Sequence, residues 1–406
     1  MKKRLGGLMM MMMMMIAVSG GSVLADEPGA QNEMNLLRQR VAELEKKQET
    51  AESKEAGAMD KISDKIAFGG VIAGAYQYES PSGSPECNDL DRGALPIQAE
   101  LSVKPAEADE IFFKVGFAGG NGLNTEGHAF VLAPWAADLE DDVKDLNGRN
   151  RDYLLTAWYA HTFTFSDGHS LAVTGGIIDA TDYLDDNAYA NCEFTQFMNA
   201  ALVNGPNAFL PSYDIGGAVA WEIGKVSMRG VVMGIGENDE GKSYRFYGVQ
   251  AGYTLDTALG EGTYRVLVDA TSSDFSDPEE SGKESLKAMI LSFDQALGDI
   301  IGLWIRVGWS EDSAIIDFKD LYSGGINISG TLWGREEDNI GLGYAHLSGG
   351  NQDIDRTQVV EGYVRFALNP VFAVTLDAQY LDDRYEKGAG DDVDGWITGI
   401  RLTAMF

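Results

Sequence analysis

From Lys65 to its last residue, the chain consists of short segments in which apolar and polar residues alternate. Each segment is close to the roughly 9 to 11 residues with which a tilted strand crosses an outer membrane. After the first 25 positions no run of 18 apolar residues occurs, which excludes a bundle of membrane-spanning helices. We count sixteen strand segments: residues 65–77, 94–104, 109–118, 151–165, 169–178, 214–223, 226–236, 243–254, 262–272, 285–297, 300–309, 321–329, 339–348, 357–368, 371–381 and 395–406.

The connections between these segments alternate between long and short. Residues 78–93, 119–150 and 179–213 form long connections, whereas the intervening turns are as short as Ser-Asp-Gly at 166–168. A membrane barrel with both ends in the periplasm has this asymmetry, because tight turns lie on one side and bulky loops on the other. The predicted fold class is all-β, a transmembrane antiparallel β-barrel of about sixteen strands over residues 65–406, wide enough for an aqueous channel.

The last segment ends the chain on an aromatic residue. Trp396 and Phe406 share one face of this segment with the alternate residues between them. A terminal aromatic residue in that phase resembles the assembly signal of outer-membrane barrels. Together with the alternation of the loops, it favours a membrane barrel over a soluble sandwich.

Residues 1–25 have the pattern of a secretory signal peptide. The charged residues Lys2 to Arg4 precede an apolar stretch at Leu8 to Val18, and cleavage is expected after Ala25. A retained membrane anchor is the alternative. Export of the chain predicts a location in the bacterial envelope, which for a barrel of this kind is the outer membrane.

Residues 26–64 predict a short helix that would lie in the periplasm. Met34, Leu37, Val41 and Leu44 are spaced by three, four and three residues, which is the seam of a coiled coil over about two heptads. A solvated helical spacer with no partner is the alternative. If the barrel forms a homotrimer, a small periplasmic stalk is a reasonable hypothesis.

The charge and the motifs exclude several classes of function. With 63 acidic against 31 basic residues and a formal net charge of −32, nucleic-acid binding is disfavoured. The sequence has no Cys-x-x-Cys, no nucleophile elbow and no phosphate loop, so we predict no catalytic site, no cofactor and no metal site, and no enzyme. No two of the four histidines have the spacing of a metal-ligand pair: His128, His161, His169 and His346.

Much of the acidic charge falls in the long loops, which predicts an acidic rim at the cell surface. Runs such as Asp138–Asp142 and Asp391–Asp394 are candidates for binding divalent cations together with lipopolysaccharide. Solvated loop carboxylates are the alternative. An acidic rim favours cations at the entrance and leaves neutral solutes unhindered.

Alternation also predicts which side chains face the lumen, because one face of each strand meets lipid and the other meets water. Arginine and carboxylate groups can hydrogen-bond neighbouring hydroxyls, and an aromatic face can cover a sugar ring, so the inward set predicts a weak sugar-binding lane. Mutually neutralising charges that keep the lumen hydrated are the alternative. The predicted pore-lining residues are Lys114, Trp158, Arg265, Asp269, Trp304, Arg306, Glu361, Tyr363, Arg365, Asp377 and Arg401.

Residues 179–213 are the best candidate for a loop that folds inward and narrows the channel, because they contain the apolar stretch 194–203. A cap on the surface is the alternative. Cys87 and Cys192 fall in long connections on the same side of the predicted barrel. We therefore expect a Cys87–Cys192 disulfide in an oxidising compartment, with two free thiols as the alternative.

The sequence resembles the OprB-type carbohydrate-selective porin family over most of residues 150–406, and less clearly over 65–118. The resemblance rests on these motifs: DYLLTAWYAHTF, LAVTGGIIDATDYL, FTQFMNAAL, PSYDIGGAVAWEI, IGLWIRVGWSED, NIGLGYAHLS, TQVVEGYVRFALNPVFAVTLDAQYL and WITGIRLTAMF.

The resemblance implies a sixteen-stranded outer-membrane channel through which small sugars diffuse passively and selectively. Its alternative is a general cation-favouring porin or a siderophore-type porin. The oligomeric state also rests on the resemblance, with a homotrimer as the hypothesis.

Overall fold

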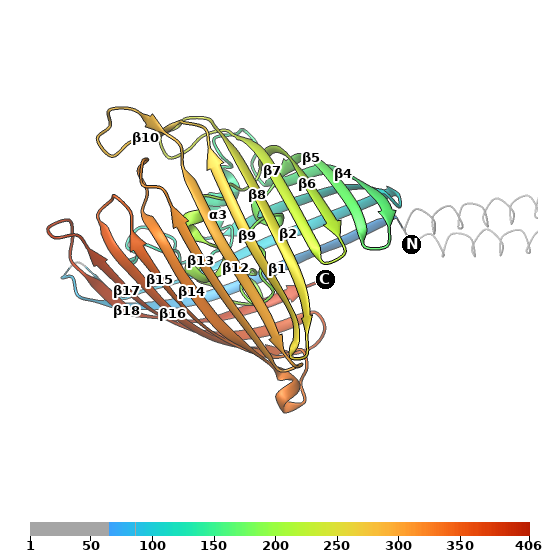
Figure 1. Ribbon diagram of the computed structural model, residues 1–406. Coiled ribbons are helices and arrows are strands. Elements are labelled where there is room, and N and C mark those ends of the chain that lie inside the picture. The colour runs from blue at the N-terminus through green and yellow to red at the C-terminus, as the bar shows by residue number, and fades with distance from the viewer. Residues whose placement is uncertain (1–64, 86) are drawn as a thin grey trace, which may run out of the picture. The chain divides into compact units, whose positions relative to one another are not determined.

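The computed structural model describes residues 65–85 and 87–406 (Figure 1). The predicted signal peptide at residues 1–25 and the predicted helix at 26–64 lie outside the described residues. In the part of the chain that is described, no helix has the length and apolar character needed to span a membrane.

The described residues form a closed antiparallel barrel of sixteen strands, which confirms the predicted fold class (Figure 1). Strands that follow one another in the sequence pair with each other, and β1 pairs with β18 to close the barrel. Closure leaves no edge strand with unpaired backbone groups facing lipid. The barrel strands are β1 (Ile66–Ser82), β2 (Leu90–Ala106), β3 (Asp109–Gly119), β4 (Leu154–Ser166), β5 (His169–Ile178), β6 (Asp214–Ile223), β7 (Val226–Ile235), β8 (Tyr244–Thr257), β9 (Gly260–Thr271), β12 (Lys287–Leu297), β13 (Ile301–Ser310), β14 (Phe318–Ser329), β15 (Asn339–Gly349), β16 (Ile354–Ala367), β17 (Phe372–Tyr385) and β18 (Val393–Met405).

A small two-stranded hairpin lies outside the barrel sheet, in one of the connections. Strands β10 (Phe275–Ser276) and β11 (Lys283–Glu284) pair with each other in the connection between β9 and β12. Strand β9 therefore pairs directly with β12 in the barrel wall.

Exposure alternates along the strands as the sequence pattern predicts. On β18, Trp396 and Leu402 are exposed on the outer face, whereas Ile397 and Arg401 are fully buried. Large apolar side chains thus face outward, where lipid replaces water as their surroundings.

The connection predicted at residues 78–93 is wrong, because both flanking strands extend into it. Strands β1 and β2 remain paired as far as Glu79 and Leu90, which leaves residues 83–89 between them. On this extension the Tyr78 hydroxyl donates to a carboxylate oxygen of Asp89 at 2.5 Å. The backbone pairing of β1 and β2 thus extends beyond the segment in which apolar residues alternate. In this extension the strands carry polar side chains, so the sequence pattern did not reveal it.

Two long connections fold into the barrel interior, and we name them loop L2 (residues 120–153) and loop L3 (residues 179–213). Loop L2 contains α3 (Glu140–Lys144), and loop L3 contains α4 (Ala200–Val203) between the short 3₁₀ turns η1 (Ala180–Asp182) and η2 (Pro206–Ala208).

An apolar cluster joins both loops to the inner wall. It contains Leu123 of L2, Phe197 and Leu202 of L3, and the strand residues Val359 and Ile397. These contacts confirm the prediction that residues 179–213 fold inward. The inward packing of L2 was not predicted.

Candidate functional site

The strongest attachment of loop L3 to the wall is Arg306 on β13, which is fully buried. Its Nε donates to the Asp185 carboxylate at 2.7 Å, and its terminal nitrogens donate to the carbonyls of Ala190 at 3.0 Å and Leu202 at 3.3 Å. One guanidinium therefore satisfies acceptors at three points along the loop, which fixes both its position and its path.

Arg401 on β18 and Glu361 on β16 hold the middle of the same loop. Arg401 donates to the carbonyls of Glu193 at 2.6 Å and Gln196 at 2.9 Å. The Glu361 carboxylate accepts the backbone N–H groups of residues 198–199 at 2.5 and 2.9 Å. Both side chains are fully buried and use their polar atoms on loop backbone.

Aromatic packing completes this contact. The Phe197 ring lies 5.6 Å from the Trp304 ring and 5.2 Å, edge-on, from the Tyr363 ring. Nearby, Asp377 is buried and accepts from the Gln379 side chain at 2.9 Å. Aromatic and polar contacts together bury these side chains between loop L3 and the wall.

The prediction that every inward residue lines an open lumen is therefore corrected on this side of the barrel. The residues in question lie inside the barrel and are buried, and all of them except Asp377 contact loop L3. They are Trp304, Arg306, Glu361, Tyr363, Asp377 and Arg401.

Loop L2 is attached by two inward carboxylates that the sequence analysis did not identify. Glu79 on β1 accepts the backbone N–H of Ala129 at 2.9 Å and also contacts the His128 ring. Asp383 on β17 accepts the backbone N–H of Val131 at 2.9 Å. The sequence did carry a signal for this attachment. Loop L2 is long and contains a run of apolar residues, which is the same kind of feature from which the inward folding of L3 was predicted.

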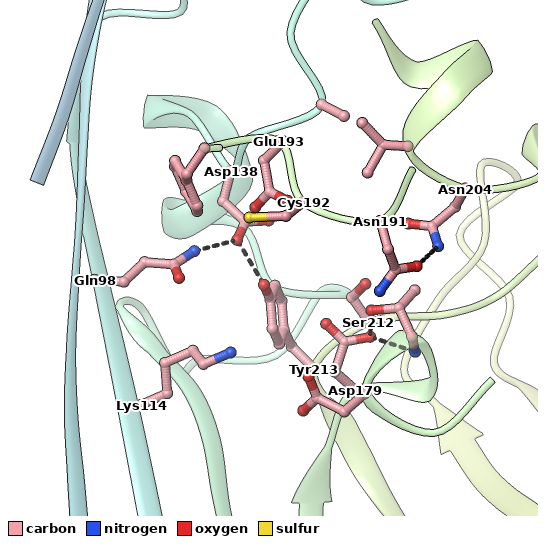
Figure 2. A pocket seen from close by; sticks show the side chains of 15 residues that line it. Gln98, Lys114, Asp138, Asp179, Asn191, Cys192, Glu193, Asn204, Ser212 and Tyr213 are labelled. Atoms are coloured by element: carbon pink, nitrogen blue, oxygen red, sulfur yellow. Dashed lines mark hydrogen bonds between the residues drawn. The ribbon is translucent and has the colours of Figure 1, made fainter. Parts of the chain in front are cut away.

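Beside β2 and β3, which only β1 separates from β18, the interior is not filled. A polar cavity of about 290 Å³ lies between β2, β3 and the two loops, and we name it the L3 cavity (Figure 2). Its lining residues are Gln98, Lys114, Ala136, Asp138, Asp179, Thr181, Asp182, Asn191, Cys192, Glu193, Phe194, Val203, Asn204, Ser212 and Tyr213.

Lys114 on β3 is the predicted residue that lies in this cavity. Its side chain points into the cavity and keeps 14% of its surface exposed (Figure 2). Its Nζ lies 3.9 Å from the Glu100 carboxylate on the neighbouring strand. The remaining ionisable acids around it come from the loops, so the charge of the site is set by how L2 and L3 fold.

Asp138 of loop L2 also lines the cavity. It accepts the Tyr213 hydroxyl at 2.5 Å and the Gln98 amide at 3.2 Å (Figure 2). Burial raises the pKa of Asp138 to about 7, although the Tyr213 hydrogen bond acts in the other direction, and the nearby Glu193 carboxylate adds to the rise. Asp138 therefore changes charge near neutral pH.

Asp179 begins loop L3 and caps η1. Its carboxylate accepts the backbone N–H of Thr181 at 2.9 Å and the hydroxyl of the same residue at 2.7 Å. Burial, followed by the neighbouring Asp182 charge, raises the pKa of Asp179 to about 7. Two of the acids that line the cavity thus titrate in the same pH range.

Trp158 on β4 provides an aromatic surface on the wall next to β3. Its ring stacks on Phe112 with centroids 5.0 Å apart and planes 21° apart. Phe112 lies two residues before Lys114 and therefore shares its face of β3. The predicted aromatic residue Trp158 and the predicted cationic residue Lys114 therefore lie near each other on the same face of this wall.

Arg265 on β9 lies in an ion-pair network beneath loop L3. It contacts Asp294 at 2.5 Å and Asp186 at 3.1 Å, and Arg229 lies 3.4 Å from the same Asp186. Arg265 thus belongs to a mutually neutralising cluster, which is the alternative that the sequence left open.

Asp269 and Arg365 lie apart from the L3 cavity. Asp269 is 2% exposed, and neither of its carboxylate oxygens has a hydrogen-bond partner. Arg365 donates to the carbonyl of Glu337 at 2.9 Å, in the connection between β14 and β15. Neither residue lines the cavity in which Lys114 lies.

The predicted Cys87–Cys192 disulfide is contradicted, because both residues are free cysteines. Cys192 packs beside Trp135 and Phe194 and lines the L3 cavity, whereas Cys87 packs against the separate cluster that contains Leu123. The two thiols therefore lie in different apolar surroundings. Within residues 65–85 and 87–406, no group of three or more His, Cys, Asp or Glu side chains is placed to hold a metal ion.

Residues 113–406 match the family described as carbohydrate-selective porin, OprB family. The chain belongs to this family. Membership makes it a porin of the bacterial outer membrane for carbohydrates, and the family is one of channels rather than enzymes.

One relative is similar in sequence, and two solved structures are similar in fold. An uncharacterized protein of Aquifex aeolicus (strain VF5) is 32% identical over 276 residues, which cover 68% of this chain and 79% of the relative. The high-pH structure of Pseudomonas putida OprB is similar, with a TM-score of 0.65 and 13% identity, and covers 86% of this chain and 97% of its own. The outer-membrane channel DcaP of Acinetobacter baumannii shares the fold with a TM-score of 0.53 and 10% identity, over 84% of this chain and 97% of its own.

Proposed function

We propose that this porin lets small sugars diffuse passively through the L3 cavity, between the β2–β3 wall and loop L3. The observation that carries the proposal is the asymmetry of the interior. Loop L3 packs through buried contacts against the inner wall from β6 to β18, and a polar cavity of about 290 Å³ remains beside β2 and β3. This volume is near the lower end of the range of about 300 to 1,000 Å³ that is usual for small-molecule sites.

The chemistry of the lining suits a polyhydroxylated solute. The Lys114 ammonium group donates hydrogen bonds, the Asp182 carboxylate accepts them, and the side-chain amides of Gln98, Asn191 and Asn204 do both. Each contact to a hydroxyl replaces one with water, so the net affinity stays low. Weak binding at several points is what a conducting channel needs, because a tight site would trap the solute.

The buried residues that hold loop L3 have a different role in this proposal. Arg306, Glu361 and Arg401 act as positioning residues, because they set where loop L3 lies and therefore how wide the cavity is. They do not touch the solute. The stacked pair Phe112 and Trp158 lies on the β3–β4 wall next to the cavity but does not line it.

The proposal also assigns an orientation and surroundings. The signal peptide at residues 1–25 is removed, the helix at 26–64 lies in the periplasm, and loops L2 and L3 open toward the cell surface. The porin assembles as a homotrimer. Outer-wall groups near the ends of β16–β18, such as Arg384 paired with Asp392 at 3.2 Å, lie at the level of lipopolysaccharide head groups.

A general cation-favouring pore is the second candidate function, and a specific observation favours it. Four carboxylates and one ammonium group line the L3 cavity. A pore of this kind would conduct small cations and would show no saturable interaction with sugars. A siderophore-type porin, which shares the fold, would also leave sugars without effect.

Planar-bilayer recordings of the purified porin test the proposal. Neutral sugars should block the ionic current saturably, and Lys114→Gln should raise the half-blocking sugar concentration about threefold, since it removes charge-assisted hydrogen bonds. Lys225→Gln, at an exposed turn, is the matched control and should leave the block unchanged. Cation conductance without any sugar block would contradict the proposal.

A further inference from the structure

The charges that line the L3 cavity are unequal. Lys114 is the one cationic side chain among the described lining residues, and Glu100 on β2 already lies 3.9 Å from it. The loops add four carboxylates. A solute in the cavity therefore meets uncompensated negative charge rather than a balanced set.

Asp182 is the most available of these acids. It is exposed toward the cavity, and among the described residues its carboxylate has no hydrogen bond and no ion pair. By contrast, Asp138 already accepts two hydrogen bonds and Asp179 caps the start of η1. A charged group that enters the cavity would find in Asp182 a carboxylate that has no hydrogen bond and no ion pair among the described residues.

We propose that the L3 cavity selects solutes by charge, so that sugars with a protonated amine bind better than neutral sugars of the same size, and sugar acids and sugar phosphates bind worse. This inference rests on the proposed sugar path through the cavity. The cavity residues that bind hydroxyl groups contact all these solutes alike. Asp182 distinguishes among the solutes by the sign of their charge.

The expected size of the effect follows from Coulomb's law. Two unit charges about 4 Å apart in water-like surroundings interact strongly enough to change an equilibrium constant about fivefold. Salt weakens such an interaction over a screening length of about 10 Å at 0.1 M, so the measurement belongs at that ionic strength or below.

The test compares half-blocking concentrations of glucosamine, glucose and glucuronate at pH 7 in planar bilayers. Glucosamine should block at a concentration about fivefold lower than glucose, and glucuronate at a higher one. Asp182→Asn should bring glucosamine and glucose to the same value. Glu279→Gln makes the same change of charge in the exposed connection between β9 and β12, and should preserve the preference.

Each other outcome is decisive. Saturable and equal block by all three solutes would overturn the charge selection and leave the sugar channel standing. No block by any of them, with ions still conducted, would overturn the sugar path and the inference with it. A preference that survives Asp182→Asn, in a variant whose heat-modifiable gel mobility shows a folded barrel, would overturn the assignment to this cavity.

Discussion

Two regions of the inner wall differ in what their inward side chains do. On β13, β16 and β18, Arg306, Glu361 and Arg401 are fully buried and bind loop L3. On β3, Lys114 points into an open polar cavity. The comparison teaches that an inward-facing charge in a porin does not by itself mark the solute path. A loop folded into the barrel leaves strands that hold it, the anchoring side, and strands that border the L3 cavity, which we propose as the conducting side.

Removal of an anchor should have the largest effect on this division. Arg306→Ala leaves the Asp185 carboxylate and several loop carbonyls buried without their donor, and breaking a buried ion pair costs about 3 to 5 kcal/mol. We expect loop L3 to leave the anchoring side, so that single-channel conductance rises severalfold and protease cleaves within residues 179–213.

The matched control for this variant is Arg229→Ala. Arg229 also lies inside the barrel and contacts loop L3, but its side chain keeps 25% of its surface exposed. Its conductance should stay close to that of the wild type. If Arg306→Ala also conducts like the wild type with the loop intact, the anchoring side has been misidentified.

A smaller effect is expected at the acidic anchor. Glu361→Gln keeps one acceptor oxygen for the backbone N–H groups of residues 198–199 and puts an amide donor in place of the other, which weakens this contact by about 1 to 3 kcal/mol. Limited proteolysis of loop L3 should become faster, whereas Glu107→Gln in an exposed turn should change nothing. Equal cleavage rates in the two variants would show that Glu361 does not hold the loop.

The conducting side should respond to pH. The pKa values of Asp138 and Asp179 are raised to about 7 by burial, so both groups are largely protonated at pH 6 and largely ionised at pH 8. Reversal potentials in a salt gradient should therefore show cation selectivity that increases from pH 6 to pH 8. The double variant Asp138→Asn with Asp179→Asn should flatten this dependence, and a dependence that persists in it would come from other groups.

The same shifts predict the sign of the stability change. A carboxyl whose pKa is higher in the folded chain than in the unfolded chain stabilises the fold most below the unfolded value of 3.8. That stabilisation is lost as the pH rises through about 7. Thermal unfolding of loop contacts should therefore shift to lower temperature between pH 6 and pH 8, by the smallest amount of these predicted effects.

The sequence predicted the barrel well because every strand must present apolar side chains to lipid and polar side chains to the interior, which makes the two kinds of residue alternate. Arg306, Glu361 and Arg401 were assigned to the inner face correctly, since alternation of side chains is a property of the local backbone. Whether water or a loop covers such a residue depends on where a connection of 35 residues folds, and strand periodicity carries no information on that point.

The errors have related causes. The predicted loop at residues 78–93 was too long because the apolar pattern ends before the backbone pairing of β1 and β2 does. The Cys87–Cys192 disulfide was predicted from the side of the membrane alone, whereas the structure packs the two thiols into different clusters. Topology restricts which segments share a side, but it does not determine which of them touch.

The central claim is that solutes pass along the β2–β3 wall through the L3 cavity, and the native thiol of Cys192 tests it most directly. In a Cys87→Ser background, a positively charged methanethiosulfonate reagent should attach to Cys192 alone. We predict a stepwise fall in single-channel current and a weaker sugar block, and no change when Cys192→Ser is added. Complete modification of Cys192 by mass spectrometry, with current and sugar block unaltered, would contradict the account.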